Sequence, residues 1–250
     1  MSGHSKWHSI RFKKGIVDAR RGKLFSRLAK EIIVAARMGG GDPDTNPRLR
    51  TAIANARAVN MPNDNITRAV KRGTGELEGV NYEEILYEAY APGGVALVIE
   101  VLTDNRNRTA GEMRSLLSKK GGSLAGTNAV LFQFERKGQV RIATAKTTED
   151  DLFMVATEAG AENLENDEGF FVVTSSVEDF ETVRGAIEAA GIEIESAALA
   201  YVPQNVVPVE GGDAKKVLDL MNALEDHDDV QNVYANFDIP DEILAELSRN

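Results

Sequence analysis

The sequence predicts an α+β fold of three domains, namely an N-terminal three-helix module and two α+β domains, one of them ferredoxin-like and inserted in the other. Three observations lead to this prediction. Apolar residues recur at helical spacing within residues 1–75. Near Tyr82 the pattern changes to short segments typical of strands. Residues 139–204 then follow the order β-α-β-β-α-β, which is that of a complete ferredoxin-like unit.

Residues 1–75 are predicted to begin with a basic arm that leads into a helix. Roughly the first 18 residues show no clean period, so we interpret them as an arm. From about Arg20 onward, apolar side chains recur at spacings of one and four, which indicates a helix with an apolar stripe. The three glycines at 39–41 are expected to end it, because consecutive glycines cannot sustain a helix.

Two shorter helices are predicted to complete this module. Asn46 is typical of an N-cap and Pro47 of the first helical position, so the second helix begins there. It stops before Pro62. The third helix starts at about Asn63, and Gly73 is expected to end it. Three short helices joined by short turns predict a small bundle.

Residues 80–138 and 205–250 are predicted to form one discontinuous α+β domain. Its first part is expected to contain strands over 82–91 and 95–103, a helix over 109–120 and a strand over 129–135. Its second part is expected to contain a helix over 213–228 and a strand over 230–239. These last two elements lack partners unless they return to the sheet that begins at Tyr82. We therefore expect that return.

Residues 139–204 are predicted to be the inserted ferredoxin-like domain. The expected elements are a strand over 139–144, a helix over 148–160, strands over 161–165 and 169–175, a helix over 177–191 and a strand over 192–202. The glycines at 160 and 191 follow the two helices and are typical of helix ends.

The net charge of −10 hides an uneven distribution of charge along the chain. Residues 1–72 contain 16 Lys and Arg against 5 Asp and Glu, a net charge of +11. The remaining residues contain 13 basic and 34 acidic side chains, a net charge of −21. Such a split favours a basic module that binds a polyanion, joined to a body that polyanions repel.

The arm and the first helix hold the main candidates for nucleic-acid binding. An extended arm can place cations on phosphates, and an indole can stack on a base or a ribose. The alternative is a solvated helix face with a loose tail, but the confinement of the basic excess to one module favours nucleic acid. The candidates are Lys6, Trp7, Arg11, Lys13, Lys14, Arg20, Arg21, Lys23, Arg27 and Lys30.

The segment DNRNRT, residues 104–109, is a second concentration of polar side chains. Arg106 and Arg108 could form another phosphate-binding point. The segment could equally be a strand-to-helix turn in which Asp104 or Asn107 caps the helix. Both interpretations stay open at this point.

Signals of catalysis and metal binding are weak. The sequence contains neither a G-x-x-x-x-G-K-[ST] nor a G-x-S-x-G motif. His4 and His8 have no third ligand nearby, and His227 lies in an acidic helix end where a solvated histidine is the plainer interpretation. We expect no enzymatic activity, no cofactor, no metal and no small-molecule substrate.

The absence of cysteine and of a long apolar run also bounds the function. Without cysteine there are no disulfides and no thiolate metal sites, which suits the cytoplasm. No apolar stretch is long enough to cross a bilayer. We expect a cytoplasmic protein that does not bind membranes.

Several long motifs resemble a known family. They are GHSKW, DARRGKLFSRLAKEI, AARMGGGDPDTNPRLRTAI, NMPNDNITRAVKRGTGE, LTDNRNRT and FERKGQ. In this order, and over essentially the whole chain, the sequence resembles the YebC/PmpR family, which includes the mitochondrial translational activator of cytochrome c oxidase. The resemblance implies a helical N-terminal module, two α+β domains and no enzymatic activity. It also implies a nucleic-acid role for the basic N-terminal positions as a group.

Two functions follow from the resemblance and the charge pattern. The family is usually described as DNA-binding transcriptional regulators, and duplex DNA would then be the partner. The alternative is a ribosome-associated translation factor that binds ribosomal RNA through the basic module and meets ribosomal proteins with its acidic body. The sequence shows no clear recognition helix with base-reading side chains for duplex DNA. The translation factor fits the split of charge slightly better. A phosphate-handling enzyme, the third class, would need a site that the sequence does not show.

Overall fold

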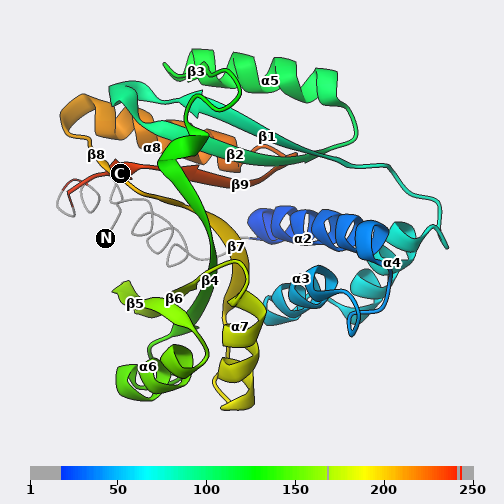
Figure 1. Ribbon diagram of the computed structural model, residues 1–250. Helices are drawn as coiled ribbons and strands as arrows, with labels where there is room; N and C mark the ends of the chain where they lie inside the picture. Colours follow the sequence, from blue (N-terminus) through cyan, green and yellow to red (C-terminus); the bar gives the residue numbers. More distant parts are fainter. Residues whose placement is uncertain (1–17, 168, 241–242, 244–250) are drawn as a thin grey trace. The chain divides into compact units, whose positions relative to one another are not determined.

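The computed structural model describes residues 18–167, 169–240 and 243. The chain divides into two compact units. One unit joins Val17–Val80 to Arg136–Ala200, and the other contains Asn81–Glu135 and the segment that starts at Tyr201. Figure 1 shows helices together with sheets of antiparallel strands in this chain. The predicted α+β fold with an N-terminal helical module is therefore confirmed.

The helical module consists of α2 (Asp18–Gly39), α3 (Pro47–Ala58) and α4 (Asn63–Thr74). Asn46 caps α3 as predicted, because its side-chain oxygen accepts a hydrogen bond from the Leu49 amide at 3.1 Å. The same buried side chain donates to the carbonyls of Ala35 and Gly40, at 2.8 and 2.9 Å. One asparagine thus starts α3 and fixes it to the end of α2.

The third helix ends two residues later than predicted. Gly73 lies inside α4 and is buried, whereas Gly75, with a φ of 85°, takes the left-handed conformation that follows the helix. A Cβ atom at position 73 would come within 2.6 Å of the Ala36 side chain and of the Ile33 carbonyl. The prediction was wrong because this glycine permits close packing of α4 against α2, which helical periodicity does not reveal.

The rest of this unit is a ferredoxin-like domain. Its elements are β4 (Phe134–Ala143), α6 (Glu149–Glu158), β5 (Ala161–Asp167), β6 (Phe170–Ser175), α7 (Phe180–Ala189) and β7 (Ser196–Pro203). The sheet order is β5-β6-β4-β7, so the first strand lies between the third and the fourth as this topology requires. Leu152 of α6 and Ile187 of α7 pack with Ile142 and Val173 of the sheet in one buried core. The predicted β-α-β-β-α-β order is confirmed.

Two predicted strands turn out to be one. Separate strands were expected over 129–135 and 139–144, but residues 134–143 form the single strand β4. The preceding residues form a turn and the short 3-10 helix η2 (Leu131–Gln133) because the buried carboxylate of Glu88 binds them. Glu88 accepts hydrogen bonds from the amides of Asn128, Val130 and Leu131 at 2.5, 2.7 and 2.9 Å. These amides are therefore unavailable to a strand partner.

The domain boundary expected at residue 138 consequently falls inside a strand. The division of the chain into domains over 1–75, 80–138 with 205–250, and 139–204 stays a prediction.

Helix α3 contacts the ferredoxin-like domain within the same unit. Asn55 donates to the Ala197 carbonyl at 2.8 Å and accepts from the Ala197 amide at 3.1 Å, so its side chain pairs with β7 like a neighbouring strand. Arg50 and Thr51 both bind the carboxylate of Glu181 on α7, at 3.0 and 3.1 Å. These bonds hold α3 against α7 and β7.

The other unit contains a second sheet, built from β1 (Glu83–Tyr90), β2 (Ala96–Thr103), β3 (Ser123–Leu124) and β9 (Val230–Ala235) in the order β3-β1-β2-β9. The remaining elements are η1 (Pro92–Gly94), α5 (Arg106–Lys119), β8 (Val207–Pro208), α8 (Gly211–Glu225) and β10 (Phe237–Asp238). Strand β9 pairs with β2 over registers such as Leu97↔Ala235. The predicted return of the C-terminal strand to the first sheet is confirmed.

Helices α5 and α8 supply the core of this unit. Met113 and Leu117 of α5 and Leu220 of α8 are fully buried, and they pack with Leu97 and Ile99 of β2. The DNRNRT motif, residues 104–109, spans the last two residues before α5 and the first four residues of that helix.

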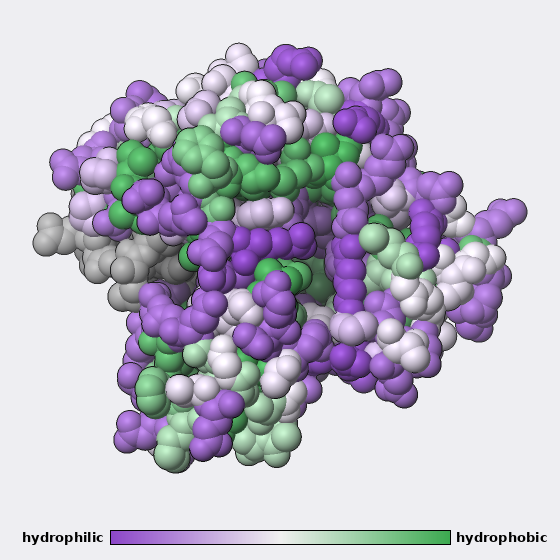
Figure 2. Space-filling model, in the orientation of Figure 1, coloured by the Kyte–Doolittle hydropathy of each residue, from purple (hydrophilic) through white to green (hydrophobic). Residues whose placement is uncertain are grey.

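Apolar side chains are also exposed at a few places. In Figure 2, hydrophobic residues are visible at the surface around α6, where Phe153 and Met154 are 55% and 60% exposed. None of the helices in the described ranges is long and apolar enough to cross a membrane.

Candidate nucleic-acid interface

The structure describes only part of the predicted basic site. Lys6, Trp7, Arg11, Lys13 and Lys14 lie outside the described residues, as does the side chain of Arg20. The other four candidates, Arg21, Lys23, Arg27 and Lys30, lie on α2. Their assignment to nucleic acid stays a prediction.

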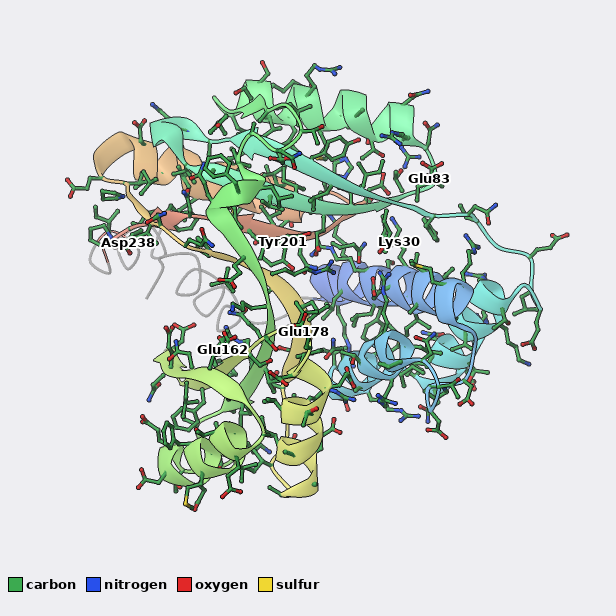
Figure 3. The ribbon with its side chains drawn as sticks, viewed as in Figure 1. Lys30, Glu83, Glu162, Glu178, Tyr201 and Asp238 are labelled. Atoms are coloured by element: carbon green, nitrogen blue, oxygen red, sulfur yellow. The ribbon has the colours of Figure 1, made fainter. Side chains whose placement is uncertain are left out.

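The α2 candidates follow two faces of the helix. Lys23, Arg27 and Lys30 are spaced by four and three residues and therefore share one side of α2. Lys23 is exposed and the other two are half-buried, and Figure 3 labels Lys30 on the helix. Arg21 lies elsewhere on the helix, with its guanidinium 5.4 Å from the ring centre of Phe25. That distance is typical of a cation–π contact, which orients both side chains.

Several basic side chains of the module are engaged by acceptors of their own unit. Arg48 forms two parallel hydrogen bonds with the carboxylate of Glu31, at 2.7 and 3.1 Å, a geometry that fixes the guanidinium. Arg50 is paired with Glu181 at 3.0 Å. Arg37 donates to the carbonyl of Val80 at 3.3 Å. These arginines therefore stabilise the fold through hydrogen bonds and ion pairs within their own unit.

Four other cations of the module differ in this respect. Arg57 on α3 and Arg68, Lys71 and Arg72 on α4 are exposed, and none of the ion pairs found within the described part of the chain includes them. Lys71 and Arg72 occupy the last turn of α4, where the helix dipole favours cations. The candidate list drawn from the sequence missed these four residues. The sequence did contain a signal for the three cations on α4, because Asp64 in the first turn is the one acidic residue of that helix and offers few internal partners for them.

A groove runs between α2 and α4 beside two of these cations. Its apolar lining includes Ala29, Ile33, Met61 and Ala69, and Asn65, Arg68 and Arg72 line it from α4. Phe25 and Ser26 line it from α2, and its volume is about 210 Å³. The groove thus combines apolar walls with two guanidinium groups and an amide.

The DNRNRT segment is a helix start in which Asn105 is the cap. Its side-chain oxygen accepts from the Arg108 amide at 3.0 Å, so the helix begins at Arg106, earlier than the predicted position 109. The expectation that Asp104 or Asn107 caps the helix was wrong. Asp104 is instead paired with the Arg108 side chain at 2.9 Å.

Arg108 is surrounded by carboxylates. Its Nη2 atom lies 2.7 Å from Oδ2 of the buried Asp229, and its Nε atom lies 3.8 Å from Glu112. The hydrogen bond and the charge of Asp229 raise the pKa of Arg108 above its ordinary value. Asp229 also accepts hydrogen bonds from the hydroxyls of Thr103 and Thr109, at 3.2 and 2.8 Å. Arg108 therefore acts within a local network, and its role in nucleic-acid binding stays a prediction, as does that of the exposed Arg106.

The same network includes His227. Ligand atoms of Glu112, His227 and Asp229 lie within 4.8 Å of one another. The Nδ1 atom of His227 accepts from the Asp229 amide at 3.2 Å, which leaves Nε2 to donate to Glu112 at 3.1 Å. Both His227 nitrogens and the Oδ2 atom of Asp229 thus have protein partners, and the Arg108 cation disfavours a metal ion beside them.

Comparison with known proteins identifies both parts of the chain. The model described as "TACO1/YebC protein N-terminal domain" matches residues 5–76, and the model described as "TACO1/YebC second and third domain" matches residues 82–237. Proteins named probable transcriptional regulatory protein match at similar levels. The one from Pelotomaculum thermopropionicum is 54% identical over 96% of this chain and 100% of its own length. The one from Halothermothrix orenii is 55% identical over 99% of each chain.

A solved structure supports the fold. The crystal structure of a conserved hypothetical protein from Aquifex aeolicus matches with a TM-score of 0.86 and 48% sequence identity. The match covers 92% of this chain and 95% of that protein.

Proposed function

The chain belongs to the TACO1/YebC family, and on this premise we propose that it is a nucleic-acid-binding regulator of gene expression rather than an enzyme. The names of its relatives, probable transcriptional regulatory proteins, support this role. The role would place the protein in the cytoplasm with its nucleic acid. The YebC/PmpR resemblance noted from the sequence motifs agrees with the family.

One observation carries the proposal. The helical module holds exposed cations, Arg57, Arg68, Lys71 and Arg72, that are not neutralised by carboxylates among the described residues. The positive potential of a cation without an internal carboxylate partner is available to an external phosphate. Each phosphate contact then contributes to the binding affinity by releasing a bound counterion. Residues 1–72, which include the module, also have a net charge of +11, whereas the remaining residues have a net charge of −21.

Transcriptional regulation through duplex DNA is the first candidate, supported by the relatives' names. Translation on the ribosome is the second, and the kind of side chain on α4 favours it. The exposed cations of α4 are guanidinium and ammonium groups near the end of the helix. On this helix, only Asn63 and Asn65 add side-chain amides that could read base edges. Phosphate contacts and stacking suffice for RNA, where shape and single-stranded bases are recognised.

Sedimentation of a gently prepared lysate through a sucrose gradient at low salt separates the two candidates. If the protein regulates translation, it migrates with ribosomes or a subunit, and RNase releases it. If it regulates transcription, it stays at the top of the gradient, and the purified protein prefers particular duplex sequences at physiological salt. A protein that neither migrates with ribosomes nor binds duplex DNA would contradict the proposal as a whole.

A further inference from the structure

The groove between α2 and α4 is formed by residues that suit one nucleotide. Its lining includes apolar side chains from both helices and from the turn before α4, namely Ala29, Ile33, Met61 and Ala69. Small side chains at 29 and 69 keep the groove open, and the glycine at 73 lets the two helices approach closely just beyond it. The groove is thus a product of the helix packing and not of one mobile side chain.

The α4 side of the groove is cationic and polar. Asn65, Arg68 and Arg72 follow one another at spacings of three and four, so they form one row along the helix. All three are exposed, and the ion pairs found in the described ranges leave both arginines without a carboxylate. Two guanidinium groups one helical turn apart can hold the same phosphate or two neighbouring phosphates.

The size of the groove limits what it can hold. Its volume of about 210 Å³ is below the range of roughly 300–1,000 Å³ typical of pockets for whole small molecules. A single base or sugar of a polymer fits such a space, while the rest of the chain stays outside. A base within a duplex is stacked and paired, so only an unstacked nucleotide can enter.

The α2 side offers a surface on which a base or ribose can pack. Phe25 lines the groove and already holds the Arg21 guanidinium against its ring, at 5.4 Å from the ring centre. Aromatic rings and guanidinium planes are the surfaces on which proteins stack single-stranded bases. Ser26 and Asn65 add polar groups at the rim that can bind a 2′-hydroxyl.

We propose that the α2–α4 groove binds an unstacked nucleotide of single-stranded RNA, with its phosphate on Arg68 and Arg72 and its base or ribose against Phe25 and Ala29. This inference rests on the proposed function, because it names the form of nucleic acid that the module selects. It distinguishes the groove from the basic arm, whose cations attract any polyanion.

Fluorescence anisotropy with the full-length protein tests the proposal. The probes are a labelled RNA single strand of about ten nucleotides, the DNA strand of the same sequence, and the RNA duplex made from the same strand. Arg68→Ala and Arg72→Ala should each weaken single-stranded RNA binding about tenfold and duplex binding only about twofold. Arg57→Ala and Lys71→Ala, which remove exposed cations outside the groove, should weaken both probes by the same small factor.

Ala29→Leu provides a test that leaves the charge unchanged. Leucine is a good helix former and would fill the groove, so single-stranded RNA should bind about tenfold more weakly while the duplex binds as before. Equal melting temperatures of the variant and the parent protein establish that the fold is intact. The exposed arginine variants keep the proposal testable if Ala29→Leu fails to fold.

Three results would overturn the proposal. Equal losses for groove and control variants would show that Arg68 and Arg72 act as general cations. Unchanged RNA binding by a folded Ala29→Leu would show that the groove is not entered. Equal affinity for the DNA and RNA strands would contradict the assignment to RNA. A different result would contradict the proposed function itself: the parent protein would bind none of the three probes.

Discussion

Arg108 on α5 and Arg72 on α4 are both exposed arginines at a helix end, yet the structure gives them different surroundings. Arg108 lies 2.7 Å from Asp229 and 2.9 Å from Asp104. Arg72 has no such carboxylate among the described residues. Exposure and formal charge are thus poor guides to which cation can bind phosphate. The acidic residues brought beside it by the fold decide how much positive potential remains.

The largest effect should come from the predicted basic arm and the start of α2. Replacing Lys13, Lys14, Arg20 and Lys23 by glutamate changes the charge of the module by eight, so nucleic-acid affinity should fall at least about a thousandfold. Filter binding with RNA and duplex DNA at low salt measures this loss.

A matched variant makes that result specific. Lys119, Lys120, Lys215 and Lys216 are exposed lysines of the other unit. Their replacement by glutamate changes the net charge by the same amount, and it should weaken binding far less. Equal losses in the two variants would mean that net charge alone, and not the basic module, determines binding.

The next largest effect is expected on the free energy of unfolding when Asp229, the carboxylate that pairs with Arg108, is replaced. Asp229→Ala should lower the free energy of unfolding by about 3 kcal/mol, because it removes the buried carboxylate that pairs with Arg108 and accepts hydrogen bonds from two threonine hydroxyls. Urea unfolding measures the change. Asp219→Ala, at an exposed position of α8, is the control and should unfold like the parent protein.

A third prediction concerns a carboxylate bound by amides instead of by an arginine. Burial raises the pKa of Glu88, but hydrogen bonds from the amides of the 128–131 turn outweigh burial and lower it below its ordinary value of 4.5. A lowered pKa in the folded state means that the carboxylate stabilises the fold above pH 4.5. This contribution is lost as the pH falls from 4.5 through the lower folded-state pKa.

Glu88→Gln tests this account. The variant should be less stable than the parent protein at neutral pH, by about 2 kcal/mol, and the difference should shrink as the pH falls below 4.5. Urea unfolding at a series of pH values gives the comparison, with Glu83→Gln at the exposed end of β1 as the matched variant. A difference that stays constant down to low pH would contradict the role of the charged carboxylate.

The smallest effect is expected for Arg108 itself. Arg108→Ala should lower the urea midpoint slightly, because Asp229 keeps its two threonine donors, and it should change RNA affinity less than about twofold. Anisotropy with the same RNA probe measures the affinity. A loss as large as that of Arg72→Ala would restore Arg108 to the nucleic-acid site predicted from the sequence.

Local signals in the sequence predicted most of the fold. Asn46 with Pro47 marked a helix start, and the alternation of strands and helices predicted the ferredoxin-like order. Gly73 was misassigned because its role depends on Ala36, which lies on another helix. The strand expected at 129–135 failed for a similar reason, since Glu88, far away in sequence, binds its amides.

The candidate site was less predictable than the fold. Charge density identified the module, but the partner of Arg108 is 121 residues away, and no local pattern shows that pairing. The α2–α4 groove likewise depends on how two helices pack. Periodicity places Arg68 and Arg72 on one face, and only the tertiary structure shows that this face borders a groove.

The dependence of binding on salt tests most directly the claim that cations without internal carboxylate partners bind the nucleic acid. The slope of log K against log [salt] reports how many phosphates the protein neutralises. The slope should decrease in magnitude by about two for the double variant Arg68→Ala/Arg72→Ala and stay the same for Arg108→Ala. If Arg108→Ala reduces the slope as much per residue as the groove variant does, the distinction between paired and unpaired cations is wrong.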